Sequence, residues 1–269
     1  MPQLSEKKLF LLDMDGTIYI DQTLFPGVIP FLDTIRLSGG RYLFLTNNSS
    51  RSVDAYIDKL KRMGIPSMRD DFLTSVDALI ADLAKHPPFH KCYAFGTRTF
   101  RQQLAEAGIP ITDHLEDDID CLLMGFDTEL VFQKLEDACI LLNRGVEYIA
   151  ANPDWVCPTW YGSVPDVGCV CDMLRRATGR LPRFIGKPEP AMLLLALERT
   201  GFRADQTVMV GDRMYTDIAS GVNAGIDTVF VLSGEGTMKD VEESTKKPTW
   251  IFDDIIALHK AWEKEKSGK

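Results

Sequence analysis

The 269-residue sequence predicts an α/β fold: a Rossmann-like parallel-sheet core with an inserted α/β domain. Two observations indicate this fold class. Short apolar segments, typical of strands, alternate along the chain with segments whose apolar residues recur at helical spacing. The apolar segments are also nearly continuous, as in parallel strands that are buried on both faces of a sheet. These segments are "KLFLLD", "YLFLTN", "KCYAFG", "CLLMGF", "EYIAAN", "RFIGK", "TVMVGD" and "DTVFVL".

Helices are predicted between strands near both ends of the chain. In residues 52–64, apolar residues recur at helical spacing and Gly64 follows the last turn, which is typical of a helix that crosses between two parallel strands. Towards the other end, Pro190 stands near the start of an apolar helical pattern and Gly201 just after it. This helix is expected to join "RFIGK" to "TVMVGD" as a βαβ unit.

The middle of the chain repeats the α/β alternation by itself. Residues 76–181 contain further strand-like segments, with helices indicated at 99–108, 129–145 and 168–179. This region is long enough to form a domain of its own. We therefore expect a core made of residues 1–78 and 182–269 and an inserted α/β domain made of residues 79–181.

Composition indicates a globular protein that does not bind nucleic acid. The formal net charge is −9, and no segment rich in lysine or arginine offsets it. No segment approaches the ~20 apolar residues of a membrane span, and the first apolar run is too short for a secretory signal. We therefore expect a cytoplasmic protein with no membrane partner. The six cysteines include no C-x-x-C pair and are expected to be reduced thiols.

Polar residues suited to phosphate chemistry follow four of the predicted strands. In open parallel sheets, ligands bind beyond the carboxyl ends of the strands. Asp13 and Asp15 alone would be weak evidence, because aspartates are common in turns and helix caps. Carboxylates that converge from several strand ends, however, are unfavourable unless a cation or a proton stabilises them. The residues concerned are Asp13, Asp15, Thr46, Asn47, Asn48, Lys187, Asp212 and Asp217.

The aspartates predict a site for Mg²⁺. Asp13, Asp15 and Asp212 would supply only oxygen ligands, which Mg²⁺ prefers, and Asp217 would lie behind them. A zinc site more often contains histidine or cysteine, and the four histidines of this chain lie outside these strand ends.

These motifs resemble those of the haloacid dehalogenase superfamily of phosphohydrolases. The segments "DMDGTI", "LTNNSSRS", "IGKPEP" and "VGDRMYTDI" are similar, in this order, to the four motifs of the family. "ANPDWVCPTWYGSVPDVG" is similar to the branch of NagD and the p-nitrophenyl phosphatases, whose α/β cap lies between the second and third motifs. Thr46 and Lys187 stand 141 positions apart, far more than a βαβ unit of ~30 residues needs. The resemblance therefore implies that residues 79–181 form a cap.

The resemblance also implies a role for each aspartate. Asp13 would be the nucleophile that forms an aspartyl-phosphate intermediate, and it would also bind Mg²⁺. Asp15 would protonate the leaving group and then activate water, while its backbone carbonyl binds the metal. Because the two lie two residues apart in an extended segment, their side chains are expected to point to one face. Asp212 would bind Mg²⁺ directly, and Asp217 would reach it through water or orient Lys187.

Four residues are expected to hold the phosphoryl group. The resemblance implies that Thr46 donates its hydroxyl, that Asn47 and Asn48 donate backbone N–H groups, and that Lys187 supplies a positive charge. Gly16 is expected to let the chain turn sharply out of its strand beside the phosphate.

The expected function is Mg²⁺-dependent hydrolysis of small phosphate monoesters, either sugar phosphates or nucleoside monophosphates. A phosphomutase or phosphotransferase of the same superfamily is an alternative, and so is a catalytically silent binding module. Release of inorganic phosphate would distinguish a phosphatase from a phosphomutase, a phosphotransferase or a silent binding module. The expected partner is a small phosphorylated metabolite, and the resemblance allows a homodimer.

Substrate choice is assigned to the cap. Trp155, Trp160 and Tyr161 lie in a loop where they would stack on a base or sugar, or anchor the loop to the core of the cap. Asp166 stands where relatives commonly have glycine. If Asp166 faces the substrate, its charge would disfavour a second phosphate.

Overall fold

The structure is a computed structural model that describes residues 2–159 and 161–268, so Trp160 lies outside the described residues. Internal contacts divide the chain into two compact units, which we call the core and the inserted unit. The core comprises Met1–Thr46, Asp54–Leu73 and Lys187–Lys269, and the inserted unit comprises Asn47–Val53 and Thr74–Gly186. The segment 79–181, which we expected to be inserted, lies within the inserted unit.

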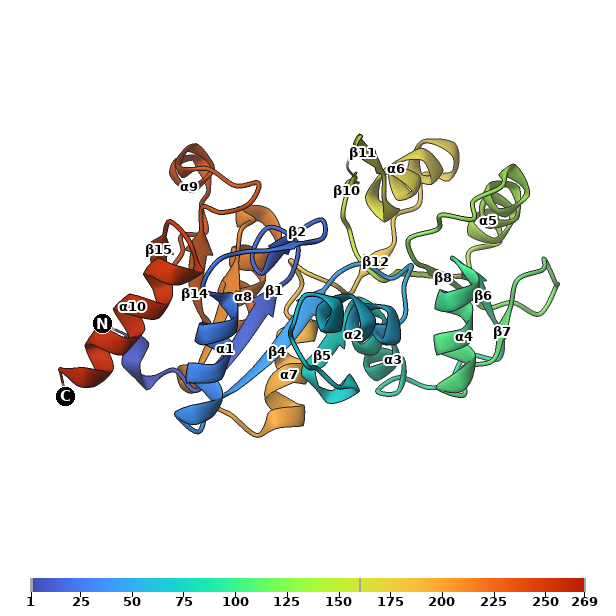
Figure 1. The fold of residues 1–269 in the computed structure, drawn as a ribbon. Helices are drawn as coiled ribbons and strands as arrows, with labels where there is room; N and C mark the ends of the chain where they lie inside the picture. The colour runs from blue at the N-terminus through green and yellow to red at the C-terminus, as the bar shows by residue number, and fades with distance from the viewer. Residues whose placement is uncertain (1, 160, 269) are drawn as a thin grey trace. The chain divides into compact units, whose positions relative to one another are not determined.

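The core is built on a six-stranded sheet with the strand order β15-β14-β13-β1-β4-β5 (Figure 1). In its centre, β1 runs parallel to β13 on one side and to β4 on the other. The register pairs Leu12 with both Val210 and Phe44, so these three strands end at nearly the same level. The strands are β1 (Leu9–Asp13), β4 (Arg41–Thr46), β5 (Phe72–Thr74), β13 (Thr207–Gly211), β14 (Asp227–Val231) and β15 (Trp250–Phe252).

Apolar packing explains why β1 is a continuous apolar run. Each of the residues from Leu9 to Leu12 is completely buried. Phe10 packs edge-on against Phe31 and Trp262, with ring centroids 5.3 and 4.8 Å apart, and each buried aromatic ring contributes about 1.5–3 kcal/mol. The core helices are α1 (Val28–Leu37), α2 (Val53–Arg62), α7 (Ala191–Thr200), α8 (Ala219–Ala224), α9 (Met238–Glu243) and α10 (Ile255–Ser267). A short hairpin of β2 (Tyr19–Ile20) and β3 (Thr23–Leu24) follows β1.

The inserted unit has a parallel sheet of its own, with five strands in the order β12-β9-β8-β6-β7. Leu122 and Tyr148 of this sheet form one buried cluster with Leu141 and Leu174. The strands are β6 (Cys92–Phe95), β7 (Ile111–Thr112), β8 (Cys121–Met124), β9 (Glu147–Ala150) and β12 (Arg183–Phe184), with an antiparallel hairpin of β10 (Val156–Thr159) and β11 (Gly162–Pro165). The helices are α3 (Ser75–Leu83), α4 (Arg98–Glu106), α5 (Phe132–Arg144) and α6 (Val167–Thr178). The predicted fold class, a parallel-sheet core with an inserted α/β domain, is confirmed.

One strand belongs to a different sheet from the one we expected. The segment "RFIGK" was expected to share a sheet with "TVMVGD", but its strand, β12, pairs with β9 of the inserted unit. The N–H groups of Ile185 and Gly186 extend this pairing by donating to the carbonyls of Ala150 and Ala151, at 3.1 and 2.8 Å. The backbone bonds of β12 are therefore satisfied within the inserted unit as far as Gly186, and the core resumes at Lys187.

Two further expectations concern membranes and thiols. Within residues 2–159 and 161–268, no helix combines the length and the apolar composition that crossing a bilayer requires. All six cysteines are free thiols.

Candidate active site

The ends of β1 and β13 bring three carboxylates together. Asp13 ends β1, Asp212 directly follows β13, and Asp217 lies in a π-helical turn, Met214–Ile218, that follows. Each offers one carboxylate oxygen, and these oxygens all lie within 4.8 Å of one another. The parallel register pairs Leu12 with Val210, so the two strands end together and Asp13 and Asp212 follow the last pair. The π-helical turn directs Asp217 back towards them.

Lys187 completes this arrangement, which we call the Asp13 cluster: Asp13, Lys187, Asp212 and Asp217. Its ammonium donates to the carboxylate of Asp13 and, at 2.6 Å, to that of Asp217. The Lys187 side chain is only 3% exposed. Three carboxylates therefore face one ammonium. The neighbouring guanidinium of Arg213, which forms an ion pair with Glu235 at 2.9 Å, adds a second positive charge that acts on Asp13 and Asp212.

Burial, together with this excess of negative charge, shifts the pKa values in the Asp13 cluster. Burial raises the pKa of Asp13 well above its ordinary value, and the negative charge of Asp217 raises it further. Burial, again with the charge of Asp217, raises the pKa of Asp212 to about 6. Burial alone would lower the pKa of Lys187, but the carboxylates of Asp13 and Asp217 outweigh it and raise that pKa. The cluster therefore favours an added positive charge.

Glycines and backbone donors fix the carboxylate of Asp212. The backbone N–H of Glu235 donates to its Oδ2 at 2.8 Å, and the hydroxyl of Thr17 donates to Oδ1 at 3.3 Å. A Cβ atom at Gly16 or at Gly234 would overlap this carboxylate, and Gly16 also has a φ of +89°. Gly16 therefore makes room for Asp212 as well as turning the chain. Sequence reasoning did not foresee that Thr17, Gly234 and Glu235 lie against Asp212, although "SGEG" at the end of a predicted strand is a signal for a close backbone approach.

Asp217 is completely buried, and its carboxylate accepts hydrogen bonds from two donors. Its Oδ1 accepts from Lys187, and its Oδ2 accepts from the backbone N–H of Arg213 at 3.1 Å. A Cβ atom at Gly211 would overlap the side chain of Asp217. Of the two roles expected for Asp217, orienting Lys187 is the one that these contacts support.

Asp15 lies apart from the three carboxylates. It follows β1 in a turn, its side chain is 58% exposed, and it does not belong to the group of converging carboxylate oxygens. Its Oδ1 lies 3.7 Å from the ammonium of Lys59, and the hydroxyl of Tyr19 donates to its Oδ2 at 3.5 Å. Asp13 thus joins a buried cluster, whereas Asp15 presents an accessible carboxylate.

The expected phosphate-binding residues fall in both units. Thr46 ends β4, the strand beside β1, and is largely buried. Asn47 and Asn48 belong to the inserted unit. There the Asn47 side chain donates to Asp154 at 2.9 Å, and Asn48 accepts from the backbone N–H of Ser50 at 2.9 Å. The structure therefore joins Asp13, Lys187, Asp212 and Asp217 in one cluster, with Thr46 on the adjacent strand.

The residues suggested for substrate choice differ in exposure. Trp155 and Tyr161 are 56% and 64% exposed, which leaves their rings accessible. Asp166 is buried and caps α6, accepting from the backbone N–H of Val167 at 2.6 Å. We expected Asp166 to disfavour a second phosphate only if it faced the substrate, and a buried helix cap does not present its charge to a ligand.

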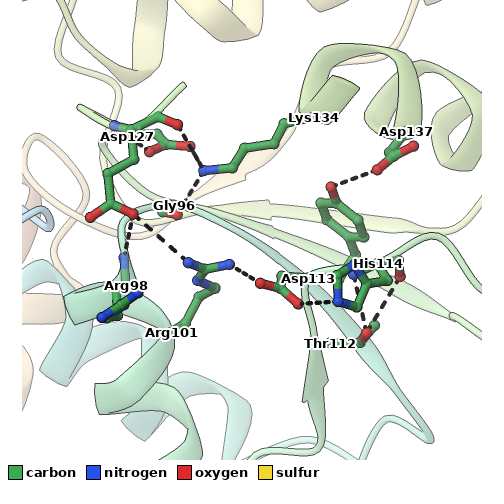
Figure 2. Close-up of polar contacts among 11 residues, drawn as sticks. Gly96, Arg98, Arg101, Thr112, Asp113, His114, Asp127, Lys134 and Asp137 are labelled. Atoms are coloured by element: carbon green, nitrogen blue, oxygen red, sulfur yellow. Dashed lines mark hydrogen bonds and ion pairs between the residues drawn. The ribbon is translucent and has the colours of Figure 1, made fainter. Parts of the chain in front are cut away.

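The strand ends of the inserted unit form a different polar cluster (Figure 2), the Lys134 cluster: Gly96, Asp127, Glu129 and Lys134. The ammonium of Lys134 donates to Asp127 at 2.6 Å and to the carbonyls of Gly96 and Glu129 at 3.3 and 3.2 Å. Asp127 is 1% exposed. One carboxylate thus faces one ammonium, and the ends of β6 and β8 are tied together.

The Asp13 cluster fits a magnesium ion. Its donors are carboxylate oxygens, which Mg²⁺ prefers, and they lie close enough together to share one ion. The raised pKa values of Asp13 and Asp212 show that ionising these groups without an added cation is unfavourable. The residues present therefore suit a small divalent cation.

Comparisons with known proteins agree with one another. A family model described as haloacid dehalogenase-like hydrolase matches residues 10–110, and one described as HAD-hydrolase-like matches residues 184–258. The chain is 32% identical over 252 residues to the acid sugar phosphatase of Staphylococcus aureus. The aligned region covers 94% of this chain and 96% of the relative.

Two solved structures share the whole fold. The 4-nitrophenylphosphatase from Thermotoga maritima is 37% identical, with a TM-score of 0.91 over 96% of this chain and 98% of that one. The glycerol phosphate phosphatase from Mycobacterium tuberculosis, solved in complex with magnesium, is 31% identical. Its TM-score is 0.90 over 98% of this chain and 80% of that one.

Proposed function

This chain belongs to the haloacid dehalogenase-like hydrolases, in the branch of NagD and the p-nitrophenyl phosphatases, and on this premise we propose that it is a Mg²⁺-dependent phosphatase of small phosphate monoesters. The observation that carries the proposal is the Asp13 cluster. Three carboxylates within 4.8 Å of one another, with one buried lysine, form an arrangement that suits phosphoryl transfer to an aspartate.

Asp13 is the proposed nucleophile. Its Oδ atom attacks the phosphorus and the bond to the leaving oxygen breaks, which leaves an aspartyl phosphate on Asp13. A carboxylate that approaches a dianionic phosphate to about 4 Å meets a repulsion of about 8 kcal/mol at an effective dielectric of ~20. Positive charge must offset this repulsion, and Lys187 supplies part of it because its ammonium already contacts Asp13.

Asp15 is the proposed acid and base. In the first step it gives a proton to the leaving alkoxide, and in the second it takes one from the water that hydrolyses the aspartyl phosphate. Its exposed carboxylate suits this role, since the proton has to reach substrate and water in turn. Thr46 would donate its hydroxyl, and Asn47 and Asn48 their backbone N–H groups, to the phosphoryl oxygens.

The Mg²⁺ ion, when bound, would neutralise the charge on the nucleophile and on the phosphoryl oxygens. Asp13, Asp212 and the backbone carbonyl of Asp15 would hold it. Asp217 orients Lys187 by accepting its hydrogen bond.

Residues 79–181, which lie in the inserted unit, are proposed to form a cap that excludes water and selects the substrate. Sugar phosphates and nucleoside monophosphates are the proposed substrate classes. The relative named as an acid sugar phosphatase favours the first class, and the glycerol phosphate phosphatase is likewise named for an ester without a nucleobase. A cytoplasmic location and a homodimer also belong to this proposal; cell fractionation and size-exclusion chromatography test them.

A direct test is to incubate the purified protein with Mg²⁺ and a panel of phosphorylated sugars, nucleoside monophosphates and 4-nitrophenyl phosphate. We expect inorganic phosphate to be released and chelation of the metal to stop the release. Transfer of the phosphoryl group to a second sugar position would identify a mutase instead, and failure to act on every ester would contradict the proposal.

A further inference from the structure

Lys59 and Tyr19 each contact one oxygen of the Asp15 carboxylate. The ammonium of Lys59 lies 3.7 Å from Oδ1, and the hydroxyl of Tyr19 donates to Oδ2 at 3.5 Å. All three residues belong to the core: Asp15 and Tyr19 lie in and after the turn that follows β1, and Lys59 lies in the last turn of α2. The two oxygens of Asp15 therefore have separate neighbours from separate elements.

Lys59 is an unusual lysine because it is buried on a helix near the surface. Its exposure is 7%, whereas Lys61, two residues further along α2, is exposed. A buried ammonium is unfavourable unless nearby groups stabilise it. Besides the carboxylate of Asp15, the ring of Tyr19 does so, since Nζ lies 3.6 Å from its centroid. Tyr19 is itself completely buried, so Lys59 and Tyr19 are both held by packing beside Asp15.

The backbone around Asp15 is fixed, while its side chain is accessible. The N–H of Gly16 donates to the carbonyl of Tyr19, and that of Ile18 to the carbonyl of Met14, both at 2.8 Å. The Asp15 side chain is nevertheless 58% exposed. An accessible carboxylate turns among several rotamers unless contacts select one of them. The contacts that select an orientation here include those from Lys59 and Tyr19.

We propose that Lys59, together with Tyr19, is a positioning residue that holds the Asp15 carboxylate in the orientation from which it transfers its proton. This inference rests on the proposed function. In the first step the proton moves from the Asp15 carboxyl to the ester oxygen as the P–O bond breaks. In the second step the Asp15 carboxylate takes a proton from water as the water oxygen bonds to phosphorus and the aspartyl P–O bond breaks. Proton transfer requires hydrogen-bond reach, so restricting the rotation of Asp15 raises kcat.

The leaving group distinguishes positioning from a merely structural role. The 4-nitrophenolate ion is a weak base and departs without a proton, whereas the alkoxide of glycerol is a strong base and needs one. In the step that forms the aspartyl phosphate, a variant that misplaces Asp15 therefore loses more on glycerol phosphate than on 4-nitrophenyl phosphate. The ratio kcat/KM reports this step, whereas hydrolysis of the aspartyl phosphate is common to both esters. A variant that only loosens the fold loses activity on both esters to the same extent.

The experiment compares Lys59→Met, Lys59→Arg and the exposed control Lys61→Met, with Asp15→Asn as the reference for complete loss of the acid. Thermal unfolding first establishes that each variant is folded. For Lys59→Met we expect kcat/KM, which reports the first step, to fall by about 10- to 100-fold on glycerol phosphate and by less than about threefold on 4-nitrophenyl phosphate. Lys59→Arg should restore most of the loss, and Lys61→Met should match the wild type.

Several outcomes would overturn the inference. Equal losses of kcat/KM on both esters for Lys59→Met would assign Lys59 a structural or a binding role. If Lys59→Met does not fold, Tyr19→Phe tests the inference in its place. The expected result is a loss of kcat/KM of about threefold on glycerol phosphate and no loss on 4-nitrophenyl phosphate. An Asp15→Asn variant without leaving-group dependence would instead contradict the proposed function, and the inference with it.

Discussion

The two parallel sheets of this molecule carry polar clusters at their strand ends that differ in charge balance. In the Asp13 cluster of the core, three carboxylates share one lysine, and the pKa values of Asp13 and Asp212 are raised. In the Lys134 cluster of the inserted unit, Asp127 and Lys134 form one ion pair, and two backbone carbonyls accept the remaining protons of the ammonium. Both clusters are largely buried, so burial alone does not mark a reactive site.

The difference indicates where chemistry takes place. The Lys134 cluster satisfies its own charges and ties two strands together, so removing one member leaves the other uncompensated. The Asp13 cluster is satisfied only when a cation is added, so removing one carboxylate relieves repulsion in the metal-free protein. Substitutions in the Asp13 cluster should therefore affect function more than stability, and those in the Lys134 cluster the reverse.

The largest expected effect is on catalysis by Asp13→Asn. The amide is not a nucleophile, so kcat should fall by more than about 10⁴-fold while the protein stays folded. The matched control is Asp127→Asn in the Lys134 cluster, which should keep kcat within about threefold at a temperature where it is folded. Steady-state kinetics with circular dichroism checks both. Substantial activity in Asp13→Asn would show that Asp13 is not the nucleophile.

The same two variants should reverse their order in stability. Asp127→Asn leaves the ammonium of Lys134, 15% exposed, without its carboxylate, and should lower the free energy of unfolding by about 2–4 kcal/mol. Asp13→Asn removes one of three converging negative charges and should leave the metal-free protein as stable as the wild type or more so. Urea denaturation with a chelator present measures both. Equal losses would mean that charge balance does not distinguish the two clusters.

Metal affinity is a third property, after catalysis and stability, in which the two clusters should differ. A Cβ atom at Gly234 would overlap the carboxylate of Asp212, whereas one at Gly96 would overlap the ring of Phe100. Gly234→Ala should therefore lower the affinity for Mg²⁺ by about 10- to 100-fold by displacing a ligand. Gly96→Ala should lower stability and leave the affinity unchanged. Titration of phosphatase activity with Mg²⁺ tests this pair, and an unaltered affinity in Gly234→Ala would exclude Asp212 as a direct ligand.

Strand ends could be predicted from the sequence because parallel strands align there. The apolar runs before Asp13 and Asp212 indicated buried strands. The register of β1 with β13 aligns the ends of these strands, and the two carboxylates lie within 4.8 Å of each other. The sheet to which "RFIGK" belongs could not be read, because β12 is a two-residue strand whose partner, β9, is set by packing rather than by its own composition.

The misses within the site have similar causes. Lys59 reads as one more surface lysine of an amphipathic helix, since the sequence does not show that α2 brings it beside Asp15. Asp166 does carry a local signal, because an aspartate immediately before an apolar helical segment is typical of an N-cap. Asp166 is indeed the N-cap of α6 in the structure.

The smallest expected effect is the pH dependence of metal binding in the Asp13 cluster. Asp212 has a pKa of about 6 in the folded, metal-free protein, above its unfolded value of 3.8. Between these values the folded state holds the proton more tightly, so this group makes the metal-free protein more stable as the pH falls and less stable as it rises through about 6.

Binding of Mg²⁺ requires the ionised carboxylate, and at pH 5 only about one tenth of Asp212 is ionised. Because the pKa of Asp13 is raised as well, the affinity for Mg²⁺ should fall by at least about tenfold between pH 7.5 and pH 5, and the increase in Tm caused by a fixed Mg²⁺ concentration should shrink accordingly. Thermal unfolding at both pH values, with and without Mg²⁺, measures this. In Asp127→Asn the same pH dependence should persist, because the Lys134 cluster has no part in it. A stabilisation by Mg²⁺ that is equal at both pH values would show that the raised pKa of Asp212 does not control the site.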